Sequence, residues 1–255
     1  MKALAYFAAL ISAPAFAANF TVERELQRIV ADYQVDPHLQ DIVFGIEVDG
    51  EAWTVEATPA TAGKQASARL SRGLPRVPTF SWTMDRATFD KIATGKMSAL
   101  TANAAAFLSD VTPLEDRELN GFRFDTNFVQ NVFRPLIFHF WTTGLPEVVR
   151  FGFERARLVH GGRAVPGIYA PGIRTAWYGL LKGDHINKDL RSQKDPWSTA
   201  FFIIKGGTAK ARIGNQVIRL EGRSMIHVPP NTVHEFWNDG EVPAEMIMVT
   251  FGKDS

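Results

Sequence analysis

The sequence has no cysteine among its 255 residues, and its formal net charge is only +1. The missing cysteine excludes disulfide bonds, iron–sulfur clusters and thiol catalysis. The near-neutral charge gives no electrostatic attraction to nucleic acid or to anionic lipid. A composition of 45% hydrophobic and 22% charged residues is that of a folded protein. No apolar run is long enough to span a bilayer, so we expect no stable membrane insertion.

Several catalytic motifs are also missing. The chain has no G-x-S-x-G nucleophile elbow, phosphate-binding glycine loop, dinucleotide fingerprint or H-E-x-x-H helix. Any enzymatic activity must therefore depend on polar residues inside a fold, and the sequence leaves open whether the protein is an enzyme.

The first 17 residues have the pattern of a secretory signal peptide. Met1–Lys2 supplies a positive charge, residues 3–11 are apolar, and Ala15-Phe16-Ala17 is a small-x-small cleavage pattern before Ala18. The sequence therefore predicts an exported protein, periplasmic or secreted.

Residues 18–144 are predicted to form an α+β domain, with helices packed on a small antiparallel sheet. Thr21 is a candidate N-cap for a helix with apolar residues at helical spacing up to Tyr33. Alternating apolar residues on both sides of Asp49-Gly50 predict a hairpin with a type I′ turn. Further strands are expected at 66–70 and 79–83. A short helix is expected from Asp85 to Gly95.

The stretch from Trp53 to about Phe107, and residues 81–97 above all, resembles the sterol carrier protein 2 type of lipid-binding domain. That resemblance implies a curved sheet with helices over an apolar tunnel, which would accept a fatty or sterol-like molecule. An ordinary hydrophobic core explains the same alternation equally well.

Residues 127–141 form an aromatic run, which fits either a ligand pocket or a packed interface between domains or subunits. Pro135 is expected to bend or divide a helix there. We interpret His139, a single histidine among aromatic residues, as a hydrogen-bonded core residue. A helix is also expected at 99–108, followed by polar turns at 110–125. The predicted domain boundary lies near Gly144.

Residues 145–255 are predicted to form an all-β domain. Strands are expected at 148–153 and 174–181, with a loop at 166–172 between them. Two apolar runs, 201–204 and 225–228, are separated by glycine-containing turns that are typical of hairpins.

The segment from Gly222 to Asn238 resembles the second motif of the cupin family: a glycine, a short strand, a proline turn, then a histidine and an asparagine. The prolines at 229 and 230 end a strand, and Asn231 can adopt the left-handed conformation in place of the family's usual glycine. The resemblance implies a cupin-like, jelly-roll barrel with His234 pointing inward. An imidazole there could bind a metal, hold an anion or move a proton.

The first cupin motif is poorly matched. With Gly206 as its final glycine, the glutamate position falls on Thr199, and the histidine positions fall near Ser192 and Lys194. None of these residues binds a transition metal well. A longer loop would instead place His185, Asn187 and Asp189 on one face of a strand. That segment fits a hydrated surface strand better.

Three functions remain, and we favour the first. It is a binding protein for a small organic molecule or a lipid, without a metal. The candidate ligand-binding residues are His234, His227, Trp177, Trp237 and Glu235. The alternative is a metal-dependent cupin enzyme, an isomerase, lyase or dioxygenase, with one divalent ion on His185, His234 and the carboxylate of Asp189. The third is a structural homodimer, which is compatible with either.

Overall fold

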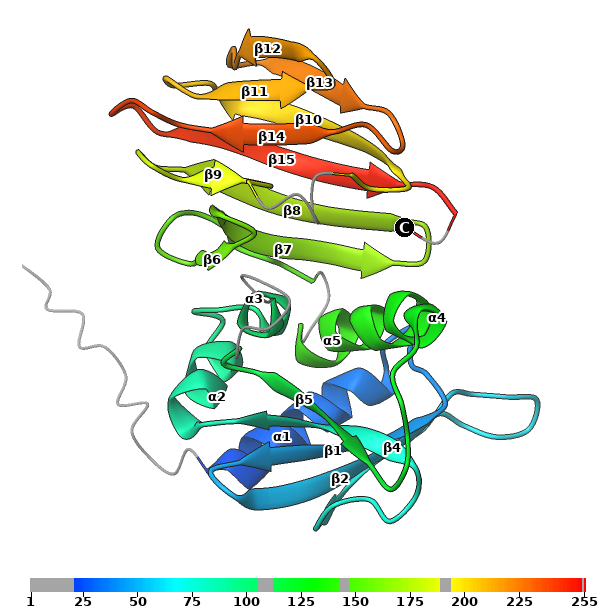
Figure 1. The fold of residues 1–255 in the computed structure, drawn as a ribbon. Helices are drawn as coiled ribbons and strands as arrows, with labels where there is room; N and C mark the ends of the chain where they lie inside the picture. Colours follow the sequence, from blue (N-terminus) through cyan, green and yellow to red (C-terminus); the bar gives the residue numbers. More distant parts are fainter. Residues whose placement is uncertain (1–20, 105–111, 143–146, 189–193, 254) are drawn as a thin grey trace, which may run out of the picture.

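The computed structural model describes residues 21–104, 112–142, 147–188, 194–253 and 255. The signal-peptide pattern, Gly144 and Asp189 lie outside these residues. Two regions are stacked on one another, an N-terminal region of helices and strands and a C-terminal region of strands (Figure 1). Each has its own hydrophobic core. No described helix is long and apolar enough to cross a membrane.

The N-terminal region contains a five-stranded sheet of order β3-β2-β1-β4-β5. Its strands are β1 (Ile42–Val48), β2 (Glu51–Thr58), β3 (Ser67–Arg72), β4 (Thr79–Met84) and β5 (Glu115–Leu119). Neighbouring strands are antiparallel except β1 and β4, which run parallel. The sheet is therefore mixed, and the purely antiparallel sheet expected from the sequence is wrong at this pair.

The local signals at the start of the chain are confirmed. Thr21 accepts a hydrogen bond from the backbone N–H of Arg24, and Asp85 accepts one from Thr88 at 2.7 Å. Both are N-caps. Asp49 and Gly50 have φ angles of 50° and 81°, as a type I′ turn between β1 and β2 requires.

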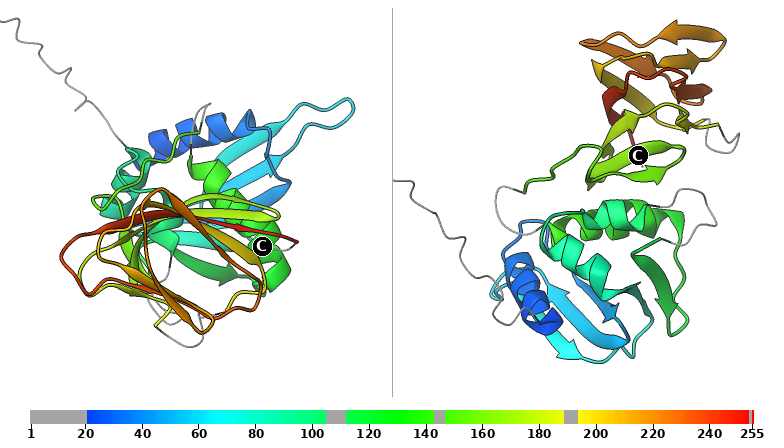
Figure 2. Two further views of the ribbon diagram at one scale, coloured as in Figure 1. Left: turned by 90° about the horizontal axis from the view of Figure 1, so that it is seen from above. Right: turned by 90° about the vertical axis from the view of Figure 1, so that its left-hand side faces the viewer.

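The helices pack on the sheet, and those formed by residues 99–103 and 126–141 lie between it and the C-terminal region (Figure 2). They are α1 (Val22–Gln34), α2 (Arg86–Ala93), α3 (Ala99–Asn103), α4 (Thr126–Phe128), the π-helix η1 (Val129–Phe133) and α5 (Arg134–Trp141). Pro135 lies in the first turn of α5, directly after the π-helix. Because proline has no N–H to continue an α-helical ladder, the expected division of this helix falls there.

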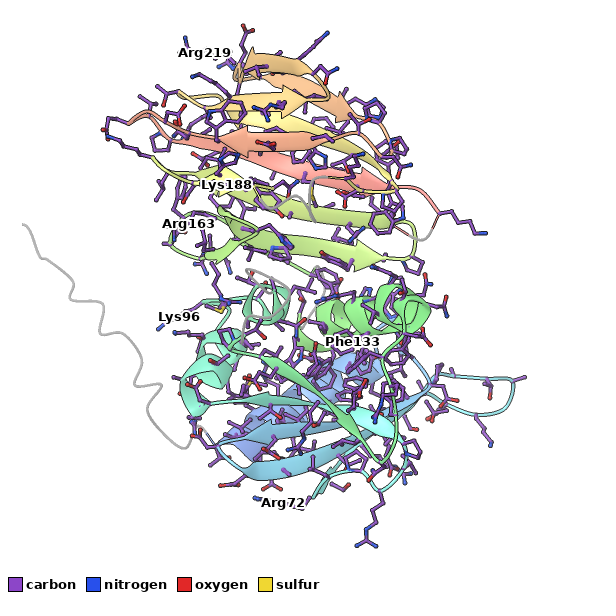
Figure 3. The ribbon with its side chains drawn as sticks, in the orientation of Figure 1. Arg72, Lys96, Phe133, Arg163, Lys188 and Arg219 are labelled. Atoms are coloured by element: carbon purple, nitrogen blue, oxygen red, sulfur yellow. The ribbon has the colours of Figure 1, made fainter. Side chains whose placement is uncertain are left out.

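Aromatic rings fill the interior of the N-terminal region. Phe80 lies within 5.1–5.8 Å of the rings of Phe44, Trp82 and Phe133. Phe133, labelled in Figure 3, comes from the π-helix and is 1% exposed. The aromatic run is thus mainly a packed core, and a lipid tunnel in this region stays a prediction.

The C-terminal region consists of two sheets around a shared core (Figure 2). Their orders are β13-β10-β15-β8-β7-β6 and β12-β11-β14-β9. The bounds are β6 (Arg157–Val159), β7 (Gly162–Ala170), β8 (Ile173–Leu180), β9 (His185–Ile186), β10 (Ser198–Lys205), β11 (Lys210–Ile213), β12 (Gln216–Arg219), β13 (Ser224–Val228), β14 (His234–Trp237) and β15 (Ala244–Phe251). Phe201 of β10 and Phe236 of β14 join the sheets with ring centroids 4.4 Å apart. Closure into a jelly-roll barrel stays a prediction.

Three predicted elements are wrong. Residues 148–153 contain no strand, because Phe151 and Phe153 instead pack against Trp177 from an irregular linker. The expected loop at 166–172 is largely part of β7, which tolerates Pro166 at an irregularity in the register with β8. The polar segment 110–125 contains β5, whose pairing with β4 stabilises a strand with little apolar character.

Arg157 joins the two regions. Its Nη1 donates to the carbonyl oxygens of Thr101, Ala102 and Ala104 at 2.7, 3.0 and 2.8 Å. These carbonyls lie at the C-terminal end of α3, where a cation also complements the helix dipole. Arg157 therefore holds α3 over the edge of the strand region.

Candidate functional site

A cavity of about 390 Å³ lies between the two C-terminal sheets, under helices α3 and α5. This volume is within the roughly 300–1,000 Å³ of small-molecule sites. The polar residues that line it are Arg134, His160, Tyr169, Arg174, Tyr178, Asn187, Asp195, His234 and Thr250. Apolar walls are supplied by residues such as Phe201 and Met248. The cavity therefore combines an apolar wall with a concentrated set of polar groups.

Arg174 supplies a cation to the cavity. It is the register partner of Tyr169 across β7 and β8, and its guanidinium carbon lies 4.0 Å from the ring centroid of Trp197. Its Nε is buried without a hydrogen-bond partner, and no ion pair joins Arg174 to a described carboxylate. A half-buried guanidinium in this state has unused capacity to bind an anion.

Tyr178 faces the same cavity four residues further along β8. Burial raises the pKa of its phenol well above the ordinary range, and the charges of Tyr169 and Asp195 raise this pKa further. The nearby charge of Arg174 acts in the opposite direction. The phenol therefore stays protonated at neutral pH and can donate a hydrogen bond to a ligand.

His234 begins β14 and is 3% exposed. The proline turn before it brings the chain inward, with Asn231 at φ 58°, in the left-handed conformation expected from the sequence. His234 Nδ1 lies 3.1 Å from the carbonyl oxygen of Thr232. Since a carbonyl can only accept, Nδ1 carries a proton, which makes Nε2 the acceptor nitrogen of the neutral imidazole. Asp195 Oδ2 lies 3.8 Å from this Nε2.

The N-terminal region supplies the roof of the cavity. The lining residues from this region are Leu100 of α3, Ala104 directly after α3, and Arg134 of α5. Arg134 donates from Nη1 to Asn103 Oδ1, and Asn103 Nδ2 donates to Asp116 Oδ1 at 2.8 Å. The N-terminal region thus supplies a second guanidinium to the cavity and holds it there through Asn103.

Three of the predicted residues lie on the opposite face of the sheet from His234. His185 pairs with Trp237 in register, and its Nε2 lies 3.0 Å from Glu235 Oε2. Arg212 Nη1 donates to the other oxygen of Glu235 at 3.1 Å. Strand alternation points Phe236 and His234 inward, and so places Glu235 and Trp237 outside the cavity. The structure does not bring His185 and His234 together.

The other predicted residues also lie elsewhere. His227 is exposed on β13, and Trp177 is buried on the outer face of β8 against Phe153, with ring centroids 5.1 Å apart. Asn187 does line the cavity, but it leaves β9 with φ 60° and does not continue a strand with His185. Alternation along β8 is the signal that could have found Tyr178, the inward neighbour of Trp177.

Residues 186–250 match the family model described as "Cupin domain". The matched residues, which lie within the C-terminal region, are thus similar to a cupin domain. No curated protein matches the chain.

The solved structures similar to the chain include a cupin 2 conserved barrel domain protein from Salinispora arenicola, at 16% identity over 43% of this chain and 91% of that one, with a TM-score of 0.36. An RmlC-like cupin family protein from Methanocaldococcus jannaschii is 15% identical over 42% of this chain and 94% of that one, with a TM-score of 0.33. A predicted oxalate decarboxylase from Thermotoga maritima is 13% identical over 31% of this chain and 64% of that one, with a TM-score of 0.27.

The described residues of the cupin domain do not fit a metal site. A protein site for a transition metal needs about three donors. Among the described residues, Asp195 supplies the carboxylate that pairs with His234, and no group of three closely spaced donors includes either of them. We therefore derive no reaction step through a metal in this cavity.

Proposed function

We propose that the protein binds a small organic molecule with an anionic group, such as a carboxylate, in the cavity of its cupin domain. The observation that carries this proposal is Arg174, a cation at the cavity whose Nε has no hydrogen-bond partner. Arg134 adds a second cation at the cavity. Asn103, which accepts a hydrogen bond from Arg134, also donates one to Asp116. An anion would accept a hydrogen bond from the Arg174 guanidinium and offset the cost of the buried Nε without a partner.

The remaining polar groups provide orientation. The phenol of Tyr178 donates, and His234 Nε2 accepts, so a ligand with an anionic end and a hydroxyl group matches the set. The apolar walls at Phe201 and Met248 would contact its carbon skeleton. Such a division between apolar walls and a few oriented polar groups is typical of small-molecule sites.

Export is part of the proposal. The pattern in residues 1–17 supports cleavage before Ala18. N-terminal sequencing of the protein from the bacterial periplasm or the medium would test it, and an N-terminus that retains Met1 would refute it.

A homodimer is also proposed. Phe202, Ile204 and Met225 are large apolar side chains on neighbouring strands β10 and β13, and they are 46%, 42% and 57% exposed. Exposed apolar surface of this kind is typical of interaction sites. Light scattering should give twice the monomer mass, and Phe202→Lys should restore the monomer.

The direct test is binding. A screen of mono- and dicarboxylates by thermal shift, followed by calorimetry, should find an organic anion that stabilises the protein. His234→Ala should weaken its binding and leave the fold intact. Failure of His234→Ala to fold would assign the histidine a structural role.

The metal-dependent enzyme is the alternative, and elemental mass spectrometry of the untagged protein separates the two. Near-stoichiometric metal that is lost in His234→Ala would favour the enzyme and overturn the binding protein without a metal.

A further inference from the structure

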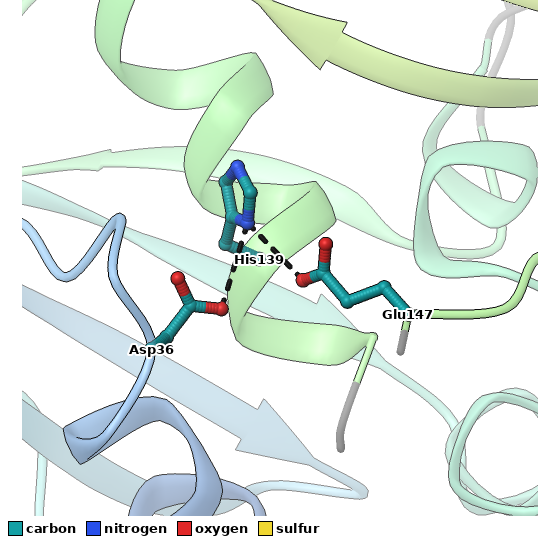
Figure 4. Close-up of side chains that lie close together, drawn as sticks. All are labelled: Asp36, His139 and Glu147. Carbon is teal, nitrogen blue, oxygen red and sulfur yellow. Dashed lines mark hydrogen bonds and ion pairs between the residues drawn. The ribbon is translucent and has the colours of Figure 1, made fainter. Parts of the chain in front are cut away.

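A second cluster of polar groups lies in the N-terminal region, away from the cavity. Asp36 follows α1, His139 belongs to the last turn of α5, and Glu147 begins the described part of the linker (Figure 4). His139 Nδ1 lies 3.5 Å from Asp36 Oδ2 and 3.1 Å from Glu147 Oε1. The three side chains are 8%, 7% and 17% exposed, in the order Asp36, His139, Glu147. A buried histidine beside two partly buried carboxyl groups needs an explanation.

Neighbouring contacts hold the cluster in place. The backbone N–H of His38 donates to Asp36 Oδ1 at 2.6 Å, which leaves Oδ2 directed at His139. The ring of His38 stacks on that of His139, with centroids 4.1 Å apart. Helices α1 and α5 pack through Tyr33 and Phe140, whose ring centroids are 5.4 Å apart. The donors are therefore preorganised by the packing of two helices.

Among the described residues, no lysine or arginine forms an ion pair with Asp36 or Glu147. Burial, and then the nearby charge of Asp36, raise the pKa of Glu147 to about 7, and the other titratable groups around Glu147 are the imidazoles of His38 and His139. Burial lowers the pKa of His139, so its imidazole is neutral at neutral pH, the form that binds metals. Two partly buried carboxyl groups and a neutral imidazole, as far as the described residues go, have no positive charge beside them that would balance a carboxylate.

We propose that Asp36, His139 and Glu147 bind a divalent transition-metal ion, with zinc as the best match. One ligand atom from each lies within 4.8 Å of the other two. Metal–ligand bonds of about 2.1 Å in a tetrahedron place neighbouring ligand atoms about 3.4 Å apart, close to the distances from His139 Nδ1. One imidazole with two carboxylates suits zinc or manganese better than calcium, which takes six to eight oxygen ligands.

The metal would tie three separate segments together. It would join the end of α1, the end of α5 and the linker to the cupin domain, which otherwise meet through hydrogen bonds at this point. Zinc binding should therefore stabilise the N-terminal region and fix the point where the linker leaves it. This role does not depend on the ligand of the cavity.

Calorimetry of the chelator-treated, untagged protein with zinc chloride tests the proposal. We expect one zinc per chain and a rise in melting temperature of at least about 5 °C with zinc at 100 times its Kd. Glu147→Gln and His139→Gln should each weaken zinc binding by more than about 100-fold. Glu147→Gln should not lower the melting temperature without zinc, because it removes one of two neighbouring buried carboxylates.

Two controls make the test specific. Glu154→Gln changes an exposed carboxylate in the same linker, and His234→Gln changes the cavity histidine. Both variants should bind zinc as the wild type does. Loss of zinc binding in His234→Gln but not in Glu147→Gln would place the metal in the cupin domain and overturn the proposal. Absence of zinc binding to the wild type at a Kd below about 100 μM would also overturn it.

Discussion

Replacing Arg174 with methionine should abolish most of the affinity for an organic anion without destabilising the protein. Methionine keeps much of the aliphatic length but has no donors. A hydrogen bond to a charged group contributes about 1.5–3 kcal/mol, which corresponds to roughly a 10- to 150-fold rise in Kd. Without ligand, the substitution removes the stacking of Arg174 on Trp197, which destabilises the folded protein by about 0.5–1 kcal/mol. It also removes a buried Nε that has no hydrogen-bond partner, which stabilises the folded protein. These two effects on the free energy of unfolding oppose each other.

The assay is calorimetry with the tightest carboxylate from the thermal-shift screen, paired with urea unfolding of each variant. Arg219→Met is the matched control, because Arg219 lies on β12 far from the junction of the two regions (Figure 3). Its Kd should equal that of the wild type, and Arg134→Met should fall between the two. The reasoning is refuted if Arg174→Met leaves the Kd unchanged, or if it loses more than about 2 kcal/mol of stability, which would make Arg174 a structural residue.

Three further predictions concern stability. Phe236→Ala should lower the free energy of unfolding, measured by urea denaturation, by about 3–5 kcal/mol, since Phe236 is 0% exposed between the sheets. A loss below about 1 kcal/mol would contradict this packing. Arg157→Met should cost about 1.5–3 kcal/mol of stability and speed limited proteolysis near α3, because three carbonyl oxygens lose a charged donor. Unchanged proteolysis would show that α3 stays in place without Arg157. Burial raises the pKa of Tyr33 from 10.0 to about 12, so the unfolded phenol ionises first and stability falls as pH rises above 10. Tyr33→Phe should therefore move the alkaline midpoint of unfolding, followed by circular dichroism, to higher pH, and an unchanged midpoint would contradict the shift.

Local signals predicted the N-terminal region well. Thr21, Asp85 and the Asp49-Gly50 turn act through contacts a few residues away, so the sequence contains all the information they need. The parallel pairing of β1 with β4 and the strand β5 depend on residues far apart in the chain. No local pattern encodes such pairings, and β5 has almost no apolar alternation to reveal it.

The candidate site was predicted only in part. The proline turn and Asn231 direct His234 inward by local geometry, whereas the inward or outward choice for His185 and His227 depends on register across the sheets. Arg134 could not be found by any local pattern, because it reaches the cavity from a helix of the other region.

Native mass spectrometry of the purified protein, compared before and after denaturation, tests the central claim most directly. The account predicts that the wild type carries or takes up an acidic small molecule, released on denaturation and absent from Arg174→Met. A neutral or cationic molecule held equally by the wild type and Arg174→Met would contradict it.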